Sequence, residues 1–184
     1  MKEEELDTSS YSATVEPVPT DASPDLPPAT SEPRWLGEDE LAAWTAAAAM
    51  VITLPGALGA QLQAEQGLTF FEYMVLAVLS EQPERTLQMS DIAHATSSSL
   101  SRLSHVVKRL ETQGFVRRER VPGAGRRTNA VLTDHGFDKV VEAAPGHVAR
   151  VRHLLIDAVP ADDLAALRRI GETVMGRIAA DRSC

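Results

Sequence analysis

The clearest hydrophobic pattern of the chain predicts an amphipathic helix near its centre. Its apolar residues recur at i, i+3, i+4 and i+7, the spacing of one helical face: Leu103, Val106, Val107 and Leu110. Ser97–Ser99 offer N-caps before this pattern, and Gly114 is a C-terminal stop after Gln113. The intervening residues are mostly small, polar or cationic, so we expect the opposite face of the helix to lie in solvent.

Two shorter helices are predicted before this one. Thr69 is an N-cap for a helix that runs to about Ser80, and a short helix begins at Ser90 after a loop. A short helix, a tight turn and a second helix with polar and cationic outer residues have the layout of a helix-turn-helix. The solvated face of an ordinary surface helix gives the same pattern, so the helix alone does not decide between the two.

A β-hairpin is predicted directly after the central helix. Residues 115–121 and 126–132 follow strand patterns, and Pro122–Gly125 form the turn between them. Arginines lie on both arms and at the tip, where they can reach DNA phosphates or the minor groove. A hairpin of this kind after a recognition helix is a wing, and it favours the helix-turn-helix interpretation.

The N-terminal part of the ordered chain, from about Trp35, is predicted to be helical and strongly apolar. No charged residue occurs from Leu41 to Gln61, which raises the question of a membrane span. Alanines contribute little to membrane insertion, and Pro55–Gly56 are expected to break or kink the helix. We therefore interpret this helix as buried, either inside a domain or at a subunit interface, and expect no membrane contact.

Two helices are predicted at the C-terminal end of the chain, at Gly136–Ala158 with a break at Pro145 and at Asp162–Ala180. Apolar residues line one face of the last helix: Leu164, Leu167, Ile170, Val174 and Ile178. Together with the uncharged N-terminal helix, this face is more apolar surface than a lone winged domain can cover.

Charge is distributed unevenly along the chain. The net charge of −8 argues by itself against a nucleic-acid partner. Residues 1–34, however, hold eight acidic residues against two basic ones and six of the eleven prolines, a composition expected of a disordered tail. Residues 97–130 hold eight basic residues against two acidic ones, so a basic patch coincides with the predicted recognition helix and wing.

The motifs around this patch resemble those of the MarR-type winged helix-turn-helix transcriptional regulators. The resemblance spans roughly Leu36 to Ile178 and rests on four blocks: Met89–Ala93, Leu103–Glu111, Gly114–Arg118 and Leu132–Gly136, the last similar to a Leu-Thr-x-x-Gly motif. It implies a mainly α-helical (α+β) fold with a two-stranded β-wing, and an obligate homodimer. The implied regions are a tail at 1–34, dimerisation helices at 35–66 and 134–184, and a DNA-binding region at 67–133.

The resemblance also implies a cytoplasmic repressor, without enzymatic activity, that binds double-stranded DNA at a near-palindromic operator. The residues expected to contact DNA lie on the outer face of the central helix and on the wing: Ser99, Ser101, Arg102, Ser104, His105, Lys108, Arg118, Arg120, Arg126 and Arg127. The wing tip departs from the family, because Ala124 stands where an aspartate usually precedes Arg126 by two residues. We therefore expect this tip to be less firmly held.

Members of the family commonly sense small phenolic or other aromatic acids between the dimerisation helices and the winged domain. The residues expected to face such a pocket are Trp44, Met50, Phe71 and Tyr73. Apolar residues at helical spacing are also typical of plain core packing. No cofactor is expected.

Other functions have weaker support in the sequence. No Gly-x-Ser-x-Gly motif accompanies the five histidines, which argues against a hydrolase. His153 and Asp157, with His147, are candidate metal ligands, and Cys184 is a candidate redox switch. A solvated helix face and an inert terminal thiol are the simpler interpretations. A winged-helix scaffold that binds proteins without DNA specificity is a further alternative, and the steep salt dependence of DNA binding would distinguish it.

Overall fold

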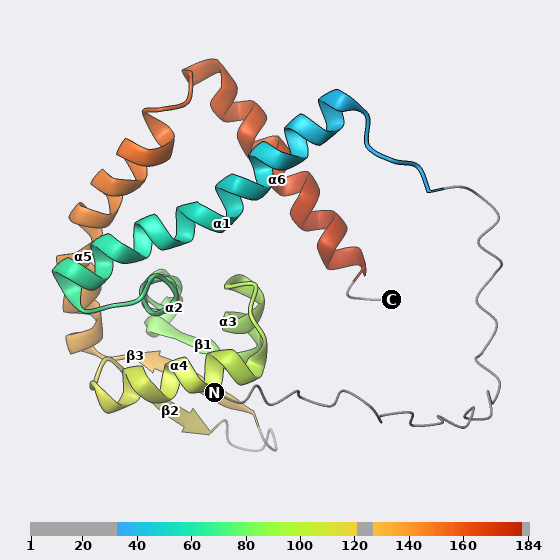
Figure 1. The fold of residues 1–184 in the computed structure, drawn as a ribbon. Coiled ribbons are helices and arrows are strands. Elements are labelled where there is room, and N and C mark those ends of the chain that lie inside the picture. The colour runs from blue at the N-terminus through green and yellow to red at the C-terminus, as the bar shows by residue number, and fades with distance from the viewer. Residues whose placement is uncertain (1–32, 121–126, 182–184) are drawn as a thin grey trace, which may run out of the picture. The chain divides into compact units, whose positions relative to one another are not determined.

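The computed structural model describes residues 33–120 and 127–181. Residues Met1–Gly37 and Glu38–Cys184 form two separate units, each described by itself. The expected tail at 1–34 therefore lies almost entirely outside the described residues, as do Ala124, Arg126 and Cys184. The described helices and strands all belong to the second unit (Figure 1).

Helices make up most of the second unit, and a small sheet accompanies them. The described helices are α1 (Glu38–Gln66), α2 (Phe70–Ser80), α3 (Met89–Ala95), α4 (Leu100–Thr112), α5 (Asp134–Val151) and α6 (Ala161–Asp181). The described strands are β1 (Thr86–Gln88), β2 (Val116–Arg120) and β3 (Thr128–Leu132), and short helical turns lie at η1 (Pro83–Arg85) and η2 (Arg152–Ile156). The predicted mainly α-helical, winged helix-turn-helix fold is confirmed, with α3 and α4 as the two helices of the motif and β2 and β3 as the wing.

Local capping explains where the central helices begin and end. Thr69 and Glu72 form a capping box at the start of α2, in which each side chain accepts the backbone N–H of the other residue. Ser99 caps α4 by accepting the N–H of Arg102. Gly114 follows α4 with φ +77°, the left-handed conformation that favours glycine after a helix. The predicted limits of the central helix are confirmed.

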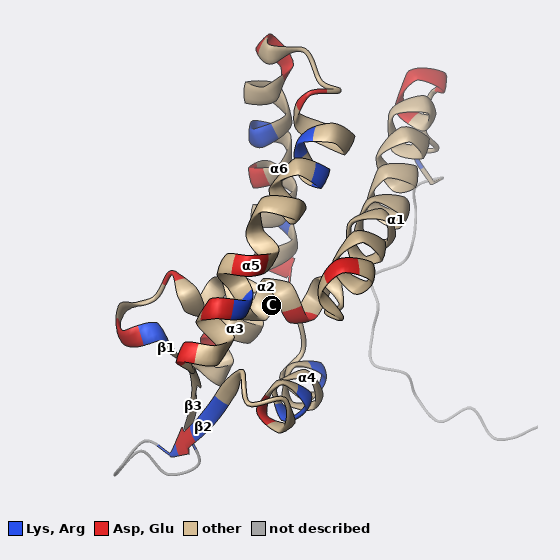
Figure 2. Cartoon of the chain, turned by 90° about the vertical axis from the view of Figure 1, so that its left-hand side faces the viewer, with Lys and Arg blue, Asp and Glu red and all other residues tan. Residues whose placement is uncertain are grey.

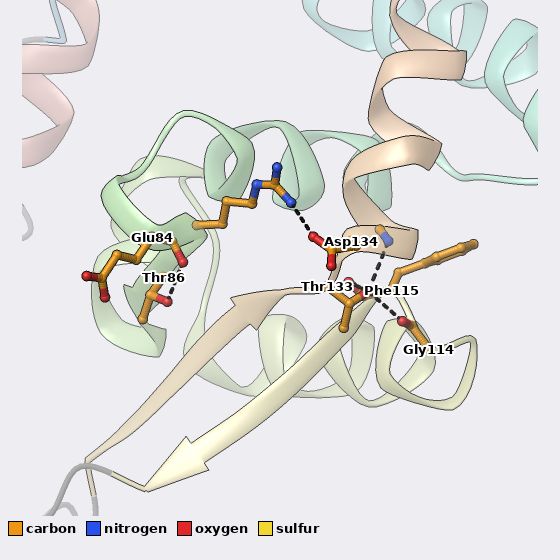
Figure 3. A network of polar contacts seen from close by, with 8 residues as sticks. Glu84, Thr86, Gly114, Phe115, Thr133 and Asp134 are labelled. Atoms are coloured by element: carbon orange, nitrogen blue, oxygen red, sulfur yellow. Dashed lines mark hydrogen bonds and ion pairs between the residues drawn. The ribbon is translucent and has the colours of Figure 1, made fainter.

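The sheet contains a strand that the sequence pattern does not predict. β1 pairs with β3 and β3 pairs with β2, which gives an antiparallel sheet of order β1-β3-β2. β1 has three residues, too few to show an alternating pattern, and Thr86 pairs with the distant Val131. Arg85, just before β1, hydrogen-bonds to Asp134 at the start of α5 (3.0 Å; Figure 3). The two-stranded wing is therefore part of a three-stranded sheet.

The hydrophobic core lies between α1, α2, α3, α4, α5 and the sheet. Its fully buried side chains include Leu62, Leu68, Leu76, Leu79, Ile92, Leu103, Val107, Leu110 and Val116. Three of the four apolar residues predicted to line α4 belong to this set, and Val106 packs against it partly buried. The predicted inner face of the central helix is thus confirmed.

Two prolines lie inside helices without ending them. α1 continues through Pro55 and α5 through Pro145, so a break at either position is wrong, while the kink expected as the alternative at Pro55 stays a prediction. A proline leaves the carbonyl four residues earlier without its helical partner, and these carbonyls belong to Val51 and Val141. Within a single chain, Val51 and Val141 are 68% and 56% exposed, so neither residue lies in the core of the described chain.

The first half of α1 is left uncovered by the rest of the described chain. Trp44 and Ile52 are 61% and 76% exposed, whereas Leu58 and Leu62, further along α1, are buried. By length and composition alone, α1 would be able to cross a membrane. Burial inside a domain is therefore the wrong interpretation for the first half of this helix, and a subunit interface is the alternative that the sequence analysis left open.

Gly136 allows α5 to begin close to the end of α4. Thr133 Oγ1 caps α5 by accepting the N–H of Gly136 (3.0 Å), and it donates to the carbonyl of Gly114 (2.7 Å; Figure 3). A Cβ on Gly136 would collide with the backbone carbonyl oxygen of Phe115. The motif Leu-Thr-x-x-Gly thus has a steric reason for its glycine.

We expect Gly136→Ala to lower the free energy of unfolding by about 1–3 kcal/mol, because the backbone must move to admit the methyl group. Urea unfolding at a fixed protein concentration measures this loss. Gly176→Ala in α6 is the matched control, since nothing lies within 4 Å of the added Cβ. That control should be neutral or stabilising. Equal losses in the two variants would contradict the steric role of Gly136.

Candidate nucleic-acid interface

The outer face of α4 presents half of the side chains that the sequence predicts to contact DNA. Those exposed on this helix are Ser101, Arg102, Ser104, His105 and Lys108. They lie opposite the buried inner face of α4. Figure 2 colours Lys and Arg positions blue along the ribbons of α4 and β2, and these two elements pack against each other. The structure therefore brings the helix and the wing into one polar, basic face.

Ser99, also predicted to contact DNA, is the N-cap of α4. Its Oγ accepts the N–H of Arg102 at 3.2 Å. A hydroxyl that accepts in this way still has its own proton to donate. Ser99 can therefore cap the helix and donate to a phosphate at the same time, and the helix N-terminus favours an anion at this position.

The arginines of the wing differ in their contacts. Arg118 donates from Nε and Nη2 to Glu111 Oε2, at 3.0 and 2.7 Å, which ties β2 to α4. These hydrogen bonds hold the pKa of the Glu111 carboxyl below its usual value. Arg120 and Arg127 are exposed on the two arms near the tip. Arg126 lies outside the described residues, so its contribution stays a prediction.

A concave surface connects the recognition helix with the wing. The hollow has a volume of about 600 Å³. Its lining includes Leu100, Ser101 and Ser104 from α4, Met89 from α3, and Arg118 and Arg127 from the wing. Four of the predicted contact residues, Ser101, Ser104, Arg118 and Arg127, therefore share one hollow.

Contacts with α2 position α4. Glu72 is fully buried, and its Oε1 forms an ion pair with Arg109 of α4 at 3.0 Å. The Arg102 guanidinium lies 4.5 Å above the centre of the Phe71 ring, a cation–π contact. Glu72 and Arg109 are not among the residues predicted as functional. The Thr-x-x-Glu spacing before an apolar run is the signal that identifies Glu72.

A second hollow, of about 700 Å³, lies between α1, α2 and α4. The aromatic residues Phe70 and Phe71 and the cationic residues Arg102 and Arg109 line it, together with Pro55, Gly59 and Gln63 from α1. Aromatic and guanidinium groups in one hollow suit a flat, anionic molecule. Arg102 therefore belongs both to this hollow and to the outer face of α4.

Of the four residues predicted to face an effector pocket, Phe71 lines this hollow. Trp44 and Met50 are exposed on α1, and Tyr73 is buried in the core, so the structure does not bring these three to it. Phe70, Arg102 and Arg109 line it without having been expected to. In the sequence, Phe70 is the neighbour of Phe71 on α2. Arg102 and Arg109 lie on one side of α4, and this shared side is the signal that could have identified them.

The metal candidates His147, His153 and Asp157 do not form a three-ligand group in the described chain. His147 is buried with its ring centre 4.4 Å from that of Tyr73, and burial lowers its pKa. Asp157 forms an ion pair with Arg152. Among the described residues, no group of three or more His, Cys, Asp or Glu side chains is placed to hold a metal ion. Cys184 lies outside the described residues.

Comparisons with known proteins agree with this geometry. Residues 66–127 match the sequence model of the MarR family. The chain is similar to Sco3205 of Streptomyces coelicolor, a MarR family transcriptional regulator solved in complex with DNA, with 37% identity and a TM-score of 0.75, covering 77% of this chain and 89% of that one. It is also similar to AbsC, a MarR family regulator of the same organism, with 37% identity and a TM-score of 0.76, covering 80% of this chain and 99% of that one. No curated protein sequence matches the chain.

Proposed function

Because the chain belongs to the MarR family of DNA-binding transcriptional regulators, we propose that it is a homodimeric, cytoplasmic repressor that a small aromatic acid releases from DNA. The observation that carries this proposal is the row of exposed polar and basic side chains along α4, which continues into the arginines of the wing. The same face supports a role in DNA recognition rather than in catalysis. The similarity to Sco3205, solved with DNA, adds to this support.

Exposed apolar side chains support the homodimer. Large apolar residues on α1 and α6 are between 40% and 76% exposed: Trp44, Met50, Val51, Ile52, Ile170, Val174, Met175 and Ile178. Soluble monomers rarely expose so many large apolar side chains on neighbouring turns, and a two-fold interface covers them in both copies. We therefore assign 35–66 and 134–184 to dimerisation and 67–133 to DNA binding. Such a dimer presents two copies of α4 roughly 34 Å apart, which suits a near-palindromic operator.

The hollow between α1, α2 and α4 supports an aromatic acid as the effector. Phe70 and Phe71 offer rings against which the effector can pack, and Arg102 and Arg109 offer charged donors for its carboxylate. Since Arg102 also lies on the outer face of α4, a carboxylate that binds it draws this side chain away from DNA. Effector binding and DNA binding then compete for one residue.

Displacement of an operator duplex tests this effector class. In fluorescence anisotropy, benzoate and 4-hydroxybenzoate are expected to weaken DNA binding by the wild type, and to do so less in Phe71→Ala. Benzamide is the control, because it keeps the ring and lacks the charge. If the acids have no more effect than benzamide, the effector proposal is wrong. If the protein binds DNA without sequence preference, the regulator proposal itself is contradicted.

Arg102 is expected to read bases, because it lies exposed near the N-terminus of the recognition helix. Arg102→Ala should weaken operator binding by roughly 1–3 kcal/mol and relax discrimination at one base pair. Lys108→Ala, further along the same face, is the comparison, and it should weaken operator and scrambled DNA alike. If Arg102→Ala also weakens both duplexes equally, Arg102 contacts a phosphate instead.

A further inference from the structure

Leu100 is an apolar side chain at the start of α4 that the core does not bury. Leu103, Val107 and Leu110 of the same helix are fully buried, whereas Leu100 is 55% exposed. It is the first residue of α4, directly after the N-cap Ser99. The apolar stripe of the recognition helix thus extends beyond the core into the first turn, where packing within the described chain does not account for it.

The surroundings of Leu100 indicate what covers it. It lines the hollow between α4 and the wing, together with Ser101 and Ser104, and Arg118 and Arg127 line the same hollow. The N-terminal residues of a recognition helix are those that reach base edges in the major groove. The apolar group that bases present there is the C5 methyl group of thymine.

We propose that Leu100 determines part of the DNA specificity by packing against a thymine methyl group in each half-site. Leu100 and Ser104 are one helical turn apart on the same side of α4, so the leucine is bordered by a short hydroxyl side chain that leaves room for the base edge. The cationic side chains of the wing supply attraction to phosphates on the other side of the hollow.

The chemistry of Leu100 favours thymine over cytosine at this position. Cytosine lacks the C5 methyl group, and its N4 amino donor lies where thymine has the O4 acceptor. A leucine side chain can hydrogen-bond to neither of these polar groups. The methyl group is therefore the feature by which Leu100 distinguishes the two pyrimidines.

Deoxyuridine substitution tests this inference, because deoxyuridine differs from thymidine only by the missing methyl group. The wild type first selects an operator from a pool of random duplexes, and each thymine of that operator is then replaced singly by deoxyuridine. At the thymine under Leu100, the wild type should lose roughly four-fold in affinity, the value for burying about one methyl group. Replacing the symmetry-related thymine as well should bring the loss to about sixteen-fold.

Two variants of Leu100 complete the test. Leu100→Ala is expected to bind the thymine and deoxyuridine operators with equal affinity, while Leu100→Met, which keeps a long apolar side chain, retains the preference. Thymines outside the footprint of α4 are the controls in the DNA. Thermal unfolding of both variants should match that of the wild type, because the side chain is largely exposed and the Ser99 cap remains.

If no deoxyuridine substitution lowers the operator affinity of the wild type more than that of Leu100→Ala, the role of Leu100 is overturned. Such a result would not contradict DNA binding by the winged helix-turn-helix. A wild-type protein that enriches no sequence from the pool would contradict sequence-specific binding, and the role of Leu100 with it.

Discussion

Val174→Asp is expected to weaken binding to a two-half-site operator by roughly 10³-fold, from the range of specific complexes toward that of non-specific ones. Val174 lies in the exposed apolar face of α6, with Ile170 one turn before it and Ile178 one turn after it. In a symmetric dimer the substitution places an unpaired carboxylate in the interface from each copy, and both must be desolvated. The monomer that results can occupy one half-site only.

Analytical ultracentrifugation and anisotropy on the same samples measure this effect. Thr173→Asp is the matched control, because it adds the same charge at the neighbouring exposed position, outside the apolar face. That variant should stay dimeric and bind DNA as the wild type does. A Val174→Asp protein that remains a dimer with unchanged affinity would show that α6 does not form the interface.

Glu72→Ala is expected to lower the free energy of unfolding by about 2–4 kcal/mol, through the loss of a helix cap and the burial of unpaired polar groups. The carboxylate accepts both the backbone N–H and the hydroxyl of Thr69, each at 2.8 Å, and forms the ion pair with Arg109. Glu72 therefore fixes the first turn of α2 and links it to the recognition helix. Arg109 is largely exposed, so water can solvate its guanidinium when the ion pair is lost. The larger share of the lost stability therefore comes from the N–H and hydroxyl of Thr69, which lose their acceptor.

Urea unfolding at a fixed protein concentration measures the stability of this variant. Glu81→Ala, at the exposed C-terminal end of the same helix, is the control and should change stability by less than about 0.5 kcal/mol. The stability of Glu72→Gln should lie between those of Glu72→Ala and Glu81→Ala, because the amide oxygen can still accept from Thr69 while the charge facing Arg109 is lost. Similar stabilities for Glu72→Ala and Glu81→Ala would contradict the capping role.

The parts of the fold that sequence reasoning predicts well are those fixed by local interactions. Thr69 and Ser99 each cap the helix that follows, and each cap depends on residues within three positions. The apolar stripe of α4 and the turn at Gly114 are also local, so the recognition helix is predicted to within about one residue. The wing follows from two strand patterns around a Pro-Gly turn.

The parts that sequence reasoning misses depend on distant contacts or on exposure in the folded chain. Strand β1 exists because Thr86–Gln88 pair with residues more than forty positions away, and three residues carry no usable pattern. Pro55 and Pro145 lie inside α1 and α5, and the carbonyls that lose a donor belong to residues outside the core of the single chain, a property that only the folded chain shows. The uncovered half of α1 likewise becomes visible only when the rest of the chain is in place.

The candidate site divides in the same way. Helical periodicity places Ser101, Arg102 and His105 on the outer face of α4, and the structure exposes all three. Helical periodicity does not reveal that Arg118 forms an ion pair with Glu111, or that Arg102 borders a hollow shared with α1 and α2. Those relations arise where separate elements meet, and they decide which cations are held in place and which residue can respond to an effector.

Selection of bound duplexes from a random pool, followed by sequencing, tests the central claim most directly, namely that a dimer reads DNA through two copies of α4. We predict one enriched, near-palindromic motif whose half-site centres lie about 10 base pairs apart, or a multiple of this spacing. Enrichment of a single unrepeated half-site, or of no motif at all, would contradict the claim.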